Sequence, residues 1–222
     1  MPELKTGTQQ NSPQETGYKA PAFSVLAETW EQLKEVISYA ESADPGDIER
    51  IYPDFHLCKD FLQNEELRAL LGGARKLGIG IFPALPRIFR DRAAQYFERE
   101  YEAFQTFPMD GVLIRNYESF QFLKERGFDK TIILDHNLYV FNQWGKLFWK
   151  QHGAEEFTAP VELNNSELEE LGIRQGELIV YGSLPVMVTA QCIEKTVSGC
   201  SKKPTVHVLT DRCNEKYLVR NH

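Results

Sequence analysis

Asp135, His136 and Asn137 stand together directly after a mostly apolar run, Lys130–Leu134, which has the composition of a buried strand. Because histidine exchanges a proton near neutral pH, His136 could act as a general base, with Asp135 orienting its ring. The sequence has no Gly-x-Ser-x-Gly motif that would mark a nucleophile beside this pair. Asp135 and His136 are therefore the predicted catalytic residues. The structural alternative is that Asp135 caps a helix and His136 packs against its neighbours.

Polar residues also follow the other apolar runs, at the position where each predicted strand ends. Two of them are the arginines Arg87 and Arg115, whose planar guanidinium groups can bind a carboxylate-bearing ligand through paired hydrogen bonds. Each single member has a structural alternative as a helix cap or as one partner of a surface ion pair. As a group they predict a ligand pocket. The substrate-binding candidates are Arg87, Arg115, Asn116, Asn137, Glu162 and Tyr181, and the group also contains Glu28, Asp54 and Asn164.

Two cysteines, Cys192 and Cys200, have the spacing C-x7-C and are followed by the lysines Lys202 and Lys203. Nearby positive charge favours the thiolate, which is the form of cysteine that binds metal. The two thiols are therefore candidate ligands of a metal ion or an iron–sulfur cluster, although they form an incomplete set. Cys213 would supply a third thiol if the chain folds back on itself.

The bulk composition is that of a soluble globular protein: 222 residues, of which 42% are hydrophobic and 26% charged, with a net charge of −7. The acidic excess argues against a surface that coats nucleic acid, while a local basic patch stays compatible with it. No apolar run approaches the roughly 20 residues that a membrane helix needs, so we expect no membrane partner. The first residues lack the apolar core of a secretory signal, which favours the reducing cytoplasm and unpaired thiols.

Short apolar runs alternate with amphipathic segments from Ala22 onward, whereas residues 1–20 are polar and are interpreted as a disordered tail or linker. The predicted strands are Phe23–Ala27, Ile48–Tyr52, Gly80–Leu85, Gly111–Arg115, Lys130–Leu134, Phe157–Val161 and Glu177–Tyr181. The predicted helices are Trp30–Tyr39, Asn64–Leu77, Arg92–Phe104, Glu118–Glu125, Val140–Gln151 and a short helix that ends at Leu171.

Strands that are separated by single helices require parallel crossover connections, so the sequence predicts an α/β fold with the helices outside the sheet. Seven such units over residues 21–185 fit a TIM-barrel-like (β/α) barrel that lacks its last unit. After Pro185 the alternation stops, and residues 186–222 are predicted to form a cysteine-bearing extension with a β-hairpin. An incomplete barrel exposes strand edges, which predicts association with the rest of a larger polypeptide or with another subunit.

Five segments of the chain carry a family resemblance. The longest is Glu177–Cys192, which reads ELIVYGSLPVMVTAQC, and the acidic stretch Glu162–Leu171 precedes it. The other three are Ala84–Phe89, Asp110–Asn116 and Ile133–Asn142. In their order along the chain, these segments resemble the collagenase-like peptidase U-32 family. The likeness covers the chain from Phe23 to His222, and it is most similar to the C-terminal region of the large members.

The resemblance implies a TIM-barrel-like fold and, by the family's name, a peptidase, which is a hydrolase. Other relatives are RNA- or quinone-modifying hydroxylation proteins that hold an iron–sulfur cluster on four cysteines and use prephenate. By this resemblance Cys192 and Cys200 occupy the places of the first cluster cysteines. A complete cluster would then need further thiols beyond His222, in the full-length protein.

Three functional hypotheses follow from the residues and the resemblance. The first is a peptidase in which Asp135 and His136 act. The second is an iron–sulfur-dependent RNA hydroxylation module that uses prephenate, with Cys192 and Cys200 as ligands and RNA as a partner. The third is a non-catalytic scaffold, or a barrel that presents RNA to another protein. Iron and sulfide in the purified protein would favour the second hypothesis, and cleavage of a protein substrate would favour the first.

Overall fold

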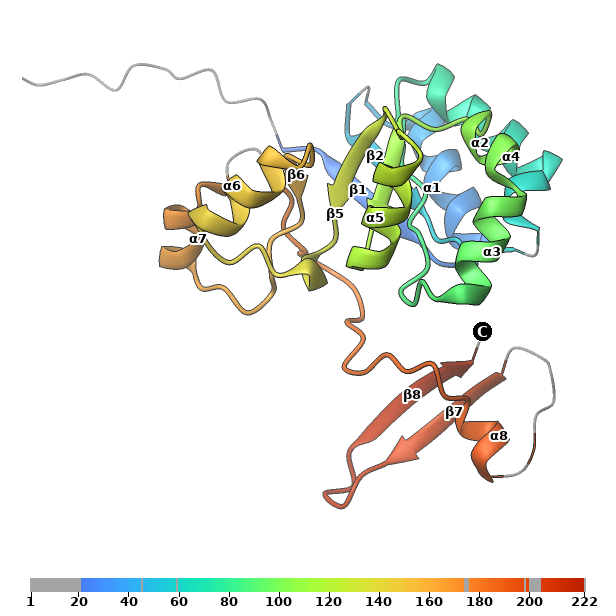
Figure 1. The fold of residues 1–222 in the computed structure, drawn as a ribbon, viewed down its shortest axis with the longest axis vertical. Coiled ribbons are helices and arrows are strands. Elements are labelled where there is room, and N and C mark those ends of the chain that lie inside the picture. The colour runs from blue at the N-terminus through green and yellow to red at the C-terminus, as the bar shows by residue number, and fades with distance from the viewer. Residues whose placement is uncertain are drawn as a thin grey trace, which may run out of the picture.

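The computed structural model describes residues 21–44, 46–58, 60–173, 176–197, 199 and 205–221. The predicted tail, Cys200 and the two lysines that follow it lie outside these residues. None of the described helices has both the length and the apolar content that crossing a membrane requires. Figure 1 shows a body of strands and helices from which a C-terminal hairpin extends on a long connection.

Within the described residues, parallel strands form two three-stranded sheets with the orders β1-β2-β3 and β4-β5-β6. An antiparallel pair, β7-β8, forms the C-terminal hairpin. Parallel sheets and a C-terminal hairpin confirm the predicted α/β class. The strands are β1 (Phe23–Ala27), β2 (Ile48–Pro53), β3 (Gly80–Ile81), β4 (Gly111–Ile114), β5 (Thr131–Leu134), β6 (Glu156–Phe157), β7 (Thr205–Thr210) and β8 (Lys216–Asn221).

Single-residue bridges connect the strands beyond the regular ladders. Ala84 pairs with Asp54, which follows β2, and with Leu113 in β4, so it joins the two parallel sheets. Glu177 pairs with Thr158, and its carbonyl accepts a hydrogen bond from the backbone N–H of Ala159 at 2.8 Å. Backbone pairing therefore continues from β1 across both sheets to Glu177.

Proline explains why the predicted strand Gly80–Leu85 is interrupted. Pro83 has no N–H to donate, and β3 ends two residues before it. Ala84 and Leu85 still donate to the carbonyls of Pro53 and Leu113, each at 2.9 Å, so the segment stays between the sheets. The predicted strand Glu177–Tyr181 is reduced to the bridge at Glu177.

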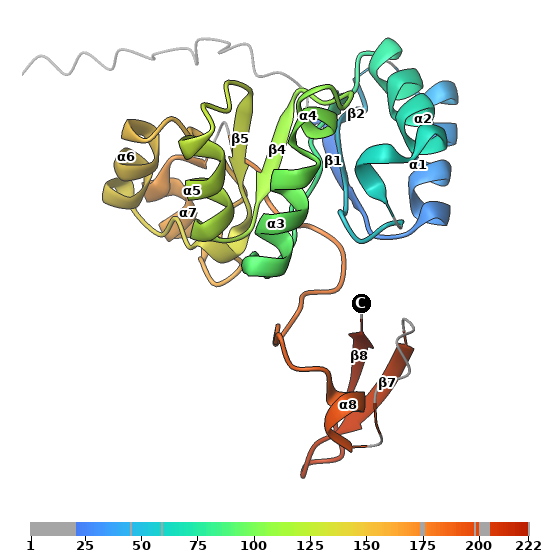
Figure 2. The same ribbon diagram turned by 45° about the vertical axis from the view of Figure 1, so that its right-hand side comes forward.

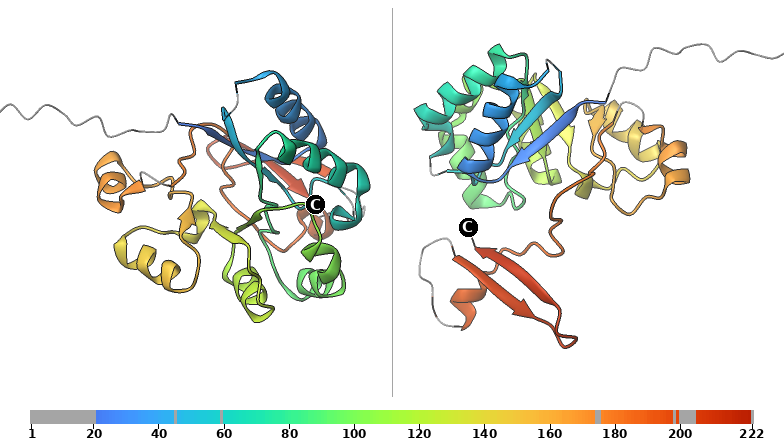
Figure 3. Two further views of the ribbon diagram at one scale, coloured as in Figure 1. Left: turned by 90° about the horizontal axis from the view of Figure 1, so that it is seen from above. Right: turned by 180° about the vertical axis from the view of Figure 1, so that it is seen from behind.

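The helices lie around the outside of the parallel strands in the view from above (Figure 3, left). They are α1 (Trp30–Ser42), α2 (Glu65–Lys76), α3 (Asp91–Arg99), α4 (Tyr101–Gln105), α5 (Tyr117–Glu125), α6 (Gln143–Gln151) and α7 (Asn165–Leu171), while the short α8 (Ile193–Val197) precedes the hairpin. The predicted helix Arg92–Phe104 is divided into α3 and α4, because the backbone of Glu100 leaves the helical conformation at φ −99° and ψ 19°.

Side-chain caps fix where several helices begin. Thr29 forms a capping box with Gln32 at the start of α1, and Asn164 forms one with Glu167 at the start of α7. Asn142 accepts a hydrogen bond from the backbone N–H of Gly145, so α6 begins at Gln143 rather than at the predicted Val140.

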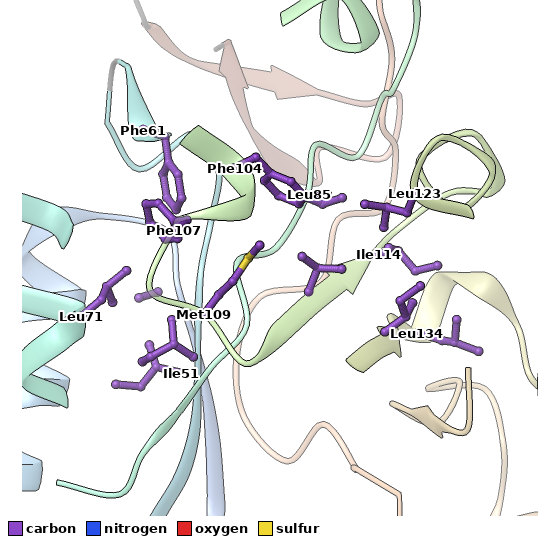
Figure 4. Packing of buried hydrophobic residues seen from close by; sticks show 14 of the residues in the cluster. Ile51, Phe61, Leu71, Leu85, Phe104, Phe107, Met109, Ile114, Leu123 and Leu134 are labelled. Atoms are coloured by element: carbon purple, nitrogen blue, oxygen red, sulfur yellow. The ribbon is translucent and has the colours of Figure 1, made fainter. Parts of the chain in front are cut away.

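Two apolar layers pack on opposite faces of the parallel strands. Since neighbouring side chains in a strand point to opposite faces, Ile51 packs toward the helices while Tyr52 points to the inner face. The layer under the helices includes Phe61, Phe104, Phe107, Ile114 and Leu134 (Figure 4). The inner layer consists of Tyr52, Phe82, Ala84, Leu113 and Ile133. Each fully buried Leu, Ile, Phe or Met side chain stabilises the fold by roughly 1.5–3 kcal/mol relative to an exposed one.

Gly111 allows β4 to lie close to the neighbouring strand β5 and to the ring of Phe82. A Cβ at this position would lie 2.1 Å from the carbonyl oxygen of Thr131 and 2.8 Å from the ring of Phe82. A larger residue would therefore separate β4 from β5 and disturb the inner layer.

A polar cluster around Glu177 ties the last backbone pairing to the first two strands. Its carboxylate accepts hydrogen bonds from Ser24 of β1 at 2.6 Å and from the hydroxyl of Tyr52 in β2 at 2.5 Å. Thr158 donates to its other oxygen at 3.1 Å, and Arg50 lies 3.7 Å away. Burial, and then the negative charge of Glu177, raises the pKa of Tyr52, which keeps its hydroxyl protonated as a donor. Glu177 thus joins both ends of the strand series.

The described residues between 178 and 221 form an arm that ends in the hairpin (Figure 2). None of its described residues is buried, and Val180 and Tyr181 are 77% and 96% exposed. Arg220 of the hairpin forms an ion pair of 3.1 Å with Glu28, which directly follows β1. The hairpin therefore reaches the side of the body on which the parallel strands end.

Replacing Glu177 by Gln should lower the free energy of unfolding by about 1–3 kcal/mol, because three donors and Arg50 lose their shared carboxylate. Urea unfolding at pH 7 measures the effect, with the exposed Glu169→Gln in α7 as the matched control. Equal stability of the two variants would contradict the role assigned to Glu177.

Candidate functional site

The carboxyl ends of β2, β4 and β5 bring Asp54, Arg115 and Asp135 together. Each follows an inner-layer residue by two positions, namely Tyr52, Leu113 and Ile133. Side chains two residues apart in a strand share a face, so all three polar groups point to the inner side. All three residues are buried. The predicted convergence of polar residues after the strands is thus observed for these three.

Arg115 is the centre of this buried cluster. Its Nη1 donates to Oδ2 of Asp54 at 2.7 Å, and its Nε lies 3.7 Å from Oδ2 of Asp135. Among the described residues, Nε and Nη2 of Arg115 and Oδ1 of Asn137 are buried without a hydrogen-bond partner. The Nδ2 of Asn137 donates to the Arg115 carbonyl at 3.0 Å. A buried donor or acceptor without a partner lowers the stability of the fold, so such atoms are typical of a site that binds a ligand or has another function.

Burial alone would raise the pKa of the Asp54 carboxyl. The positive charge of Arg115 and the backbone N–H of His56, which donates at 2.8 Å, outweigh burial and hold that pKa below its usual 3.8. Asp54 is therefore a carboxylate at neutral pH, and the Asp54–Arg115 pair is ionic.

Asp135 connects the cluster to His136. Its Oδ1 accepts a hydrogen bond from the backbone N–H of His136 at 3.0 Å and lies 2.9 Å from Nδ1 of the same residue. Burial would raise the pKa of Asp135, but the His136 hydrogen bond and the charges of Arg115 and Arg87 lower it further than burial raises it. Asp135 also caps the 3-10 helix His136–Leu138. It therefore has the capping role of the structural alternative and contacts the His136 ring at the same time.

Arg87 lies at the exposed side of the cluster, with 19% of its side chain accessible. Its Nη1 is 3.5 Å from Oδ2 of Asp135. Burial, and then repulsion from Arg115, lowers the pKa of the Arg87 guanidinium, and the nearby carboxylates only partly offset this.

Asn116 holds the loop that carries Arg87. Its Nδ2 donates to the carbonyls of Pro86 and Arg87 at 2.8 and 3.2 Å. Its Oδ1 accepts from the backbone N–H of Ser119 at 2.8 Å and so caps α5. Asn116 is thus placed to position Arg87.

Other predicted members of the pocket lie elsewhere. Glu28 is exposed and pairs with Arg220, and Asn164 caps α7. Glu162 and Tyr181 are exposed, and within the described chain neither has a hydrogen bond or ion pair to the buried cluster. A pocket of about 260 Å³ that Phe141, Gln143, Leu163 and Leu171 help to line contains none of the predicted site residues.

The described thiols do not form a metal site. Cys192 is half-buried and its Sγ accepts a hydrogen bond from the backbone N–H of Lys195 at 3.4 Å, while Cys213 is exposed in the hairpin turn. Among the residues that the structure describes, no three potential ligands lie together, and Cys200 is outside that part of the chain. Cys58 is half-buried, and burial raises the pKa of its thiol, as expected for a structural cysteine.

Sequence reasoning missed the polar cluster at Glu177. The available signal was the charged residues at inner-face positions of strands, Arg50 in β2 and Glu156 in β6, which form an ion pair of 2.5 Å. Charges at such positions are expected to pair, because isolated buried charges are costly.

Comparison with known proteins places these features in a family. A family model described as peptidase family U32 matches residues 53–219. A solved structure described as that of the U32 peptidase Mk0906 is similar, with 13% identity and a TM-score of 0.50, covering 78% of this chain and 72% of that chain. No curated protein matches the sequence.

The depressed pKa of Asp54 predicts a specific loss of stability in acid. Its folded-state pKa lies below its unfolded one, so its contribution is present above about pH 4 and is lost as pH falls through the folded value. Asp54→Asn should therefore be less stable than wild type at pH 7, and the difference should shrink toward pH 3. Urea unfolding across this range tests it, with the exposed Asp129→Asn as control. A difference independent of pH would contradict the prediction.

Proposed function

The chain belongs to peptidase family U32. We propose that it is a hydrolase that cleaves peptide bonds, and that its active site lies at the carboxyl ends of the parallel strands. The observation that carries this proposal is the 2.9 Å contact between Oδ1 of Asp135 and Nδ1 of His136. A buried carboxylate on one ring nitrogen fixes the tautomer in which the other nitrogen is a base.

In the proposed reaction Asp135 accepts a hydrogen bond from the Nδ1–H of His136, and the Nε2 lone pair of His136 takes a proton from water. The resulting hydroxide attacks the peptide carbonyl carbon and forms a C–O bond, while the π electron pair of the C=O bond moves to its oxygen. That pair re-forms the C=O bond as the C–N bond breaks, and the proton on Nε2 passes to the leaving amine. Arg115 and Arg87 stabilise Asp135 as an anion, which in turn stabilises the imidazolium that forms in this step.

We also propose that the parallel strands form a TIM-barrel-like (β/α) barrel that lacks its last unit. Backbone pairing from β1 to Glu177, together with the hydrogen bond from Ser24 back to Glu177, supports this arrangement. In such a barrel the catalytic residues lie at the carboxyl ends of the strands, which is where Asp54, Arg115 and Asp135 lie.

The proposed substrate-binding residues fall into two groups. Arg87, Arg115, Asn116 and Asn137 lie in or beside the buried cluster. Glu162 and Tyr181 lie on the surface and would contact the parts of a long peptide that extend from the site.

The arm supports two further proposals. Its exposed apolar residues suit a contact with the rest of a larger polypeptide or with another subunit in the cytoplasm, and RNA is a further proposed partner. Cys192 and Cys200 would begin an iron–sulfur site only with thiols from elsewhere, and no step of the proposed reaction depends on it. In anaerobically purified full-length protein, protection of Tyr181 from chymotrypsin tests the contact. Iron and sulfide content tests the cluster.

His136→Ala should lower kcat for cleavage of casein or gelatin by about 10²–10⁴-fold, because the variant loses its general base. His152→Ala is the matched control, since His152 is exposed at the end of α6. Circular dichroism verifies that both variants are folded. Unchanged cleavage by folded His136→Ala would refute the assignment of the base.

A further inference from the structure

We propose that Arg87 recognises a free carboxylate, namely the C-terminal carboxylate of a peptide, and that the enzyme cleaves one of the last two peptide bonds of that peptide. The inference rests on the proposed function, because it specifies the substrate of the same site. It extends that function from general peptide hydrolysis to the removal of C-terminal residues.

Arg87 and Arg115 have different roles in the cluster. Arg115 is buried, and its Nη1 is bound to Asp54 at 2.7 Å. Arg87 is partly accessible, and within the described part of the chain its guanidinium has a single hydrogen bond or ion pair, at 3.5 Å, to Asp135. A guanidinium has five N–H donors, and two parallel ones match the two oxygens of a carboxylate. Arg87 therefore retains the donors that such a ligand needs.

Asn116 holds the backbone of Arg87 in a preorganised position. The Nδ2 of Asn116 donates to the carbonyls of Pro86 and Arg87, and Asn116 is itself fixed as the cap of α5. The backbone of Arg87 is thus held in place before a ligand arrives. A fixed binding group loses less conformational entropy when it binds.

The charges around Arg87 also favour an incoming anion. Burial and the neighbouring Arg115 disfavour the charge on Arg87. Arg87 shares Asp135 with His136 and Arg115, and Asp54 is bound to Arg115. An incoming carboxylate would supply an anion that Arg87 does not share, in a partly buried place where the attraction is weakly screened.

Arg87 also lies near the proposed base, His136, on the other side of Asp135. Arg87 contacts Oδ2 of Asp135 and His136 contacts Oδ1 of the same carboxylate, so the two groups flank one side chain. An extended peptide spans about 3.5 Å per residue. A carboxylate on Arg87 therefore places one of the last two peptide bonds nearest to His136.

The test compares pairs of N-acetylated tripeptides that end in a free carboxylate or in an amide. Wild-type enzyme should show a kcat/KM at least tenfold higher for the free acid. Arg87→Gln should abolish this preference mainly by raising KM, and Arg87→Lys should keep part of it, because lysine retains the charge without the planar fork. The control is Arg90→Gln, since Arg90 is exposed at the start of α3 and should keep the full preference.

Calorimetric binding to His136→Ala separates this inference from the proposed function. The free acid should bind at least tenfold more tightly than the amide, and Arg87→Gln on the same background should bind both equally. If neither peptide is cleaved by wild type but the binding preference holds, peptide hydrolysis fails and carboxylate recognition stands. If acid and amide bind equally, or folded Arg87→Gln keeps the preference, the inference is overturned.

Discussion

The buried ion pair between Asp54 and Arg115 is the constraint on which the site depends. A guanidinium away from water is tolerated only when an anion is placed beside it, and removing either partner would leave a buried charge. The pair spans β2 and β4, and Arg115 also contacts Asp135 after β5. The register of three strands is therefore coupled to one cation. The same cation keeps Asp135 ionised beside His136.

Two polar clusters on the inner side of the strands differ in how completely their hydrogen bonds are satisfied. The cluster at Glu177 links β1, β2 and the segment after α7, and its members are hydroxyls and charges that satisfy one another. The cluster at Arg115 leaves two donors and an acceptor without partners among the described residues. A satisfied network favours stability, whereas an incompletely satisfied one is typical of a place that binds something. The apolar layer of Tyr52, Leu113 and Ile133 separates them.

The hydrophobic pattern of the sequence was sufficient to predict the order of the strands and helices. The alternation of apolar runs and amphipathic segments predicted the order of strands and helices, and the parallel topology then placed Asp54, Arg115 and Asp135 at one edge. The divided helix at Glu100 and the interrupted strand at Pro83 changed the boundaries only. The contacts of Glu177 join residues more than 120 positions apart, so no periodicity reveals them. The strand predicted over Glu177–Tyr181 pairs only at Glu177 within the described residues, so Tyr181 lies exposed on the arm.

A double-mutant cycle on Asp54 and Arg115 tests the central claim most directly. Urea unfolding at pH 7 would compare Asp54→Asn, Arg115→Gln and the double variant with the wild type. The account predicts that each single change costs about 3 kcal/mol and that the double variant loses about 2 kcal/mol less than the sum of the two. Strictly additive losses would mean that the two side chains do not stabilise each other, and would contradict the account.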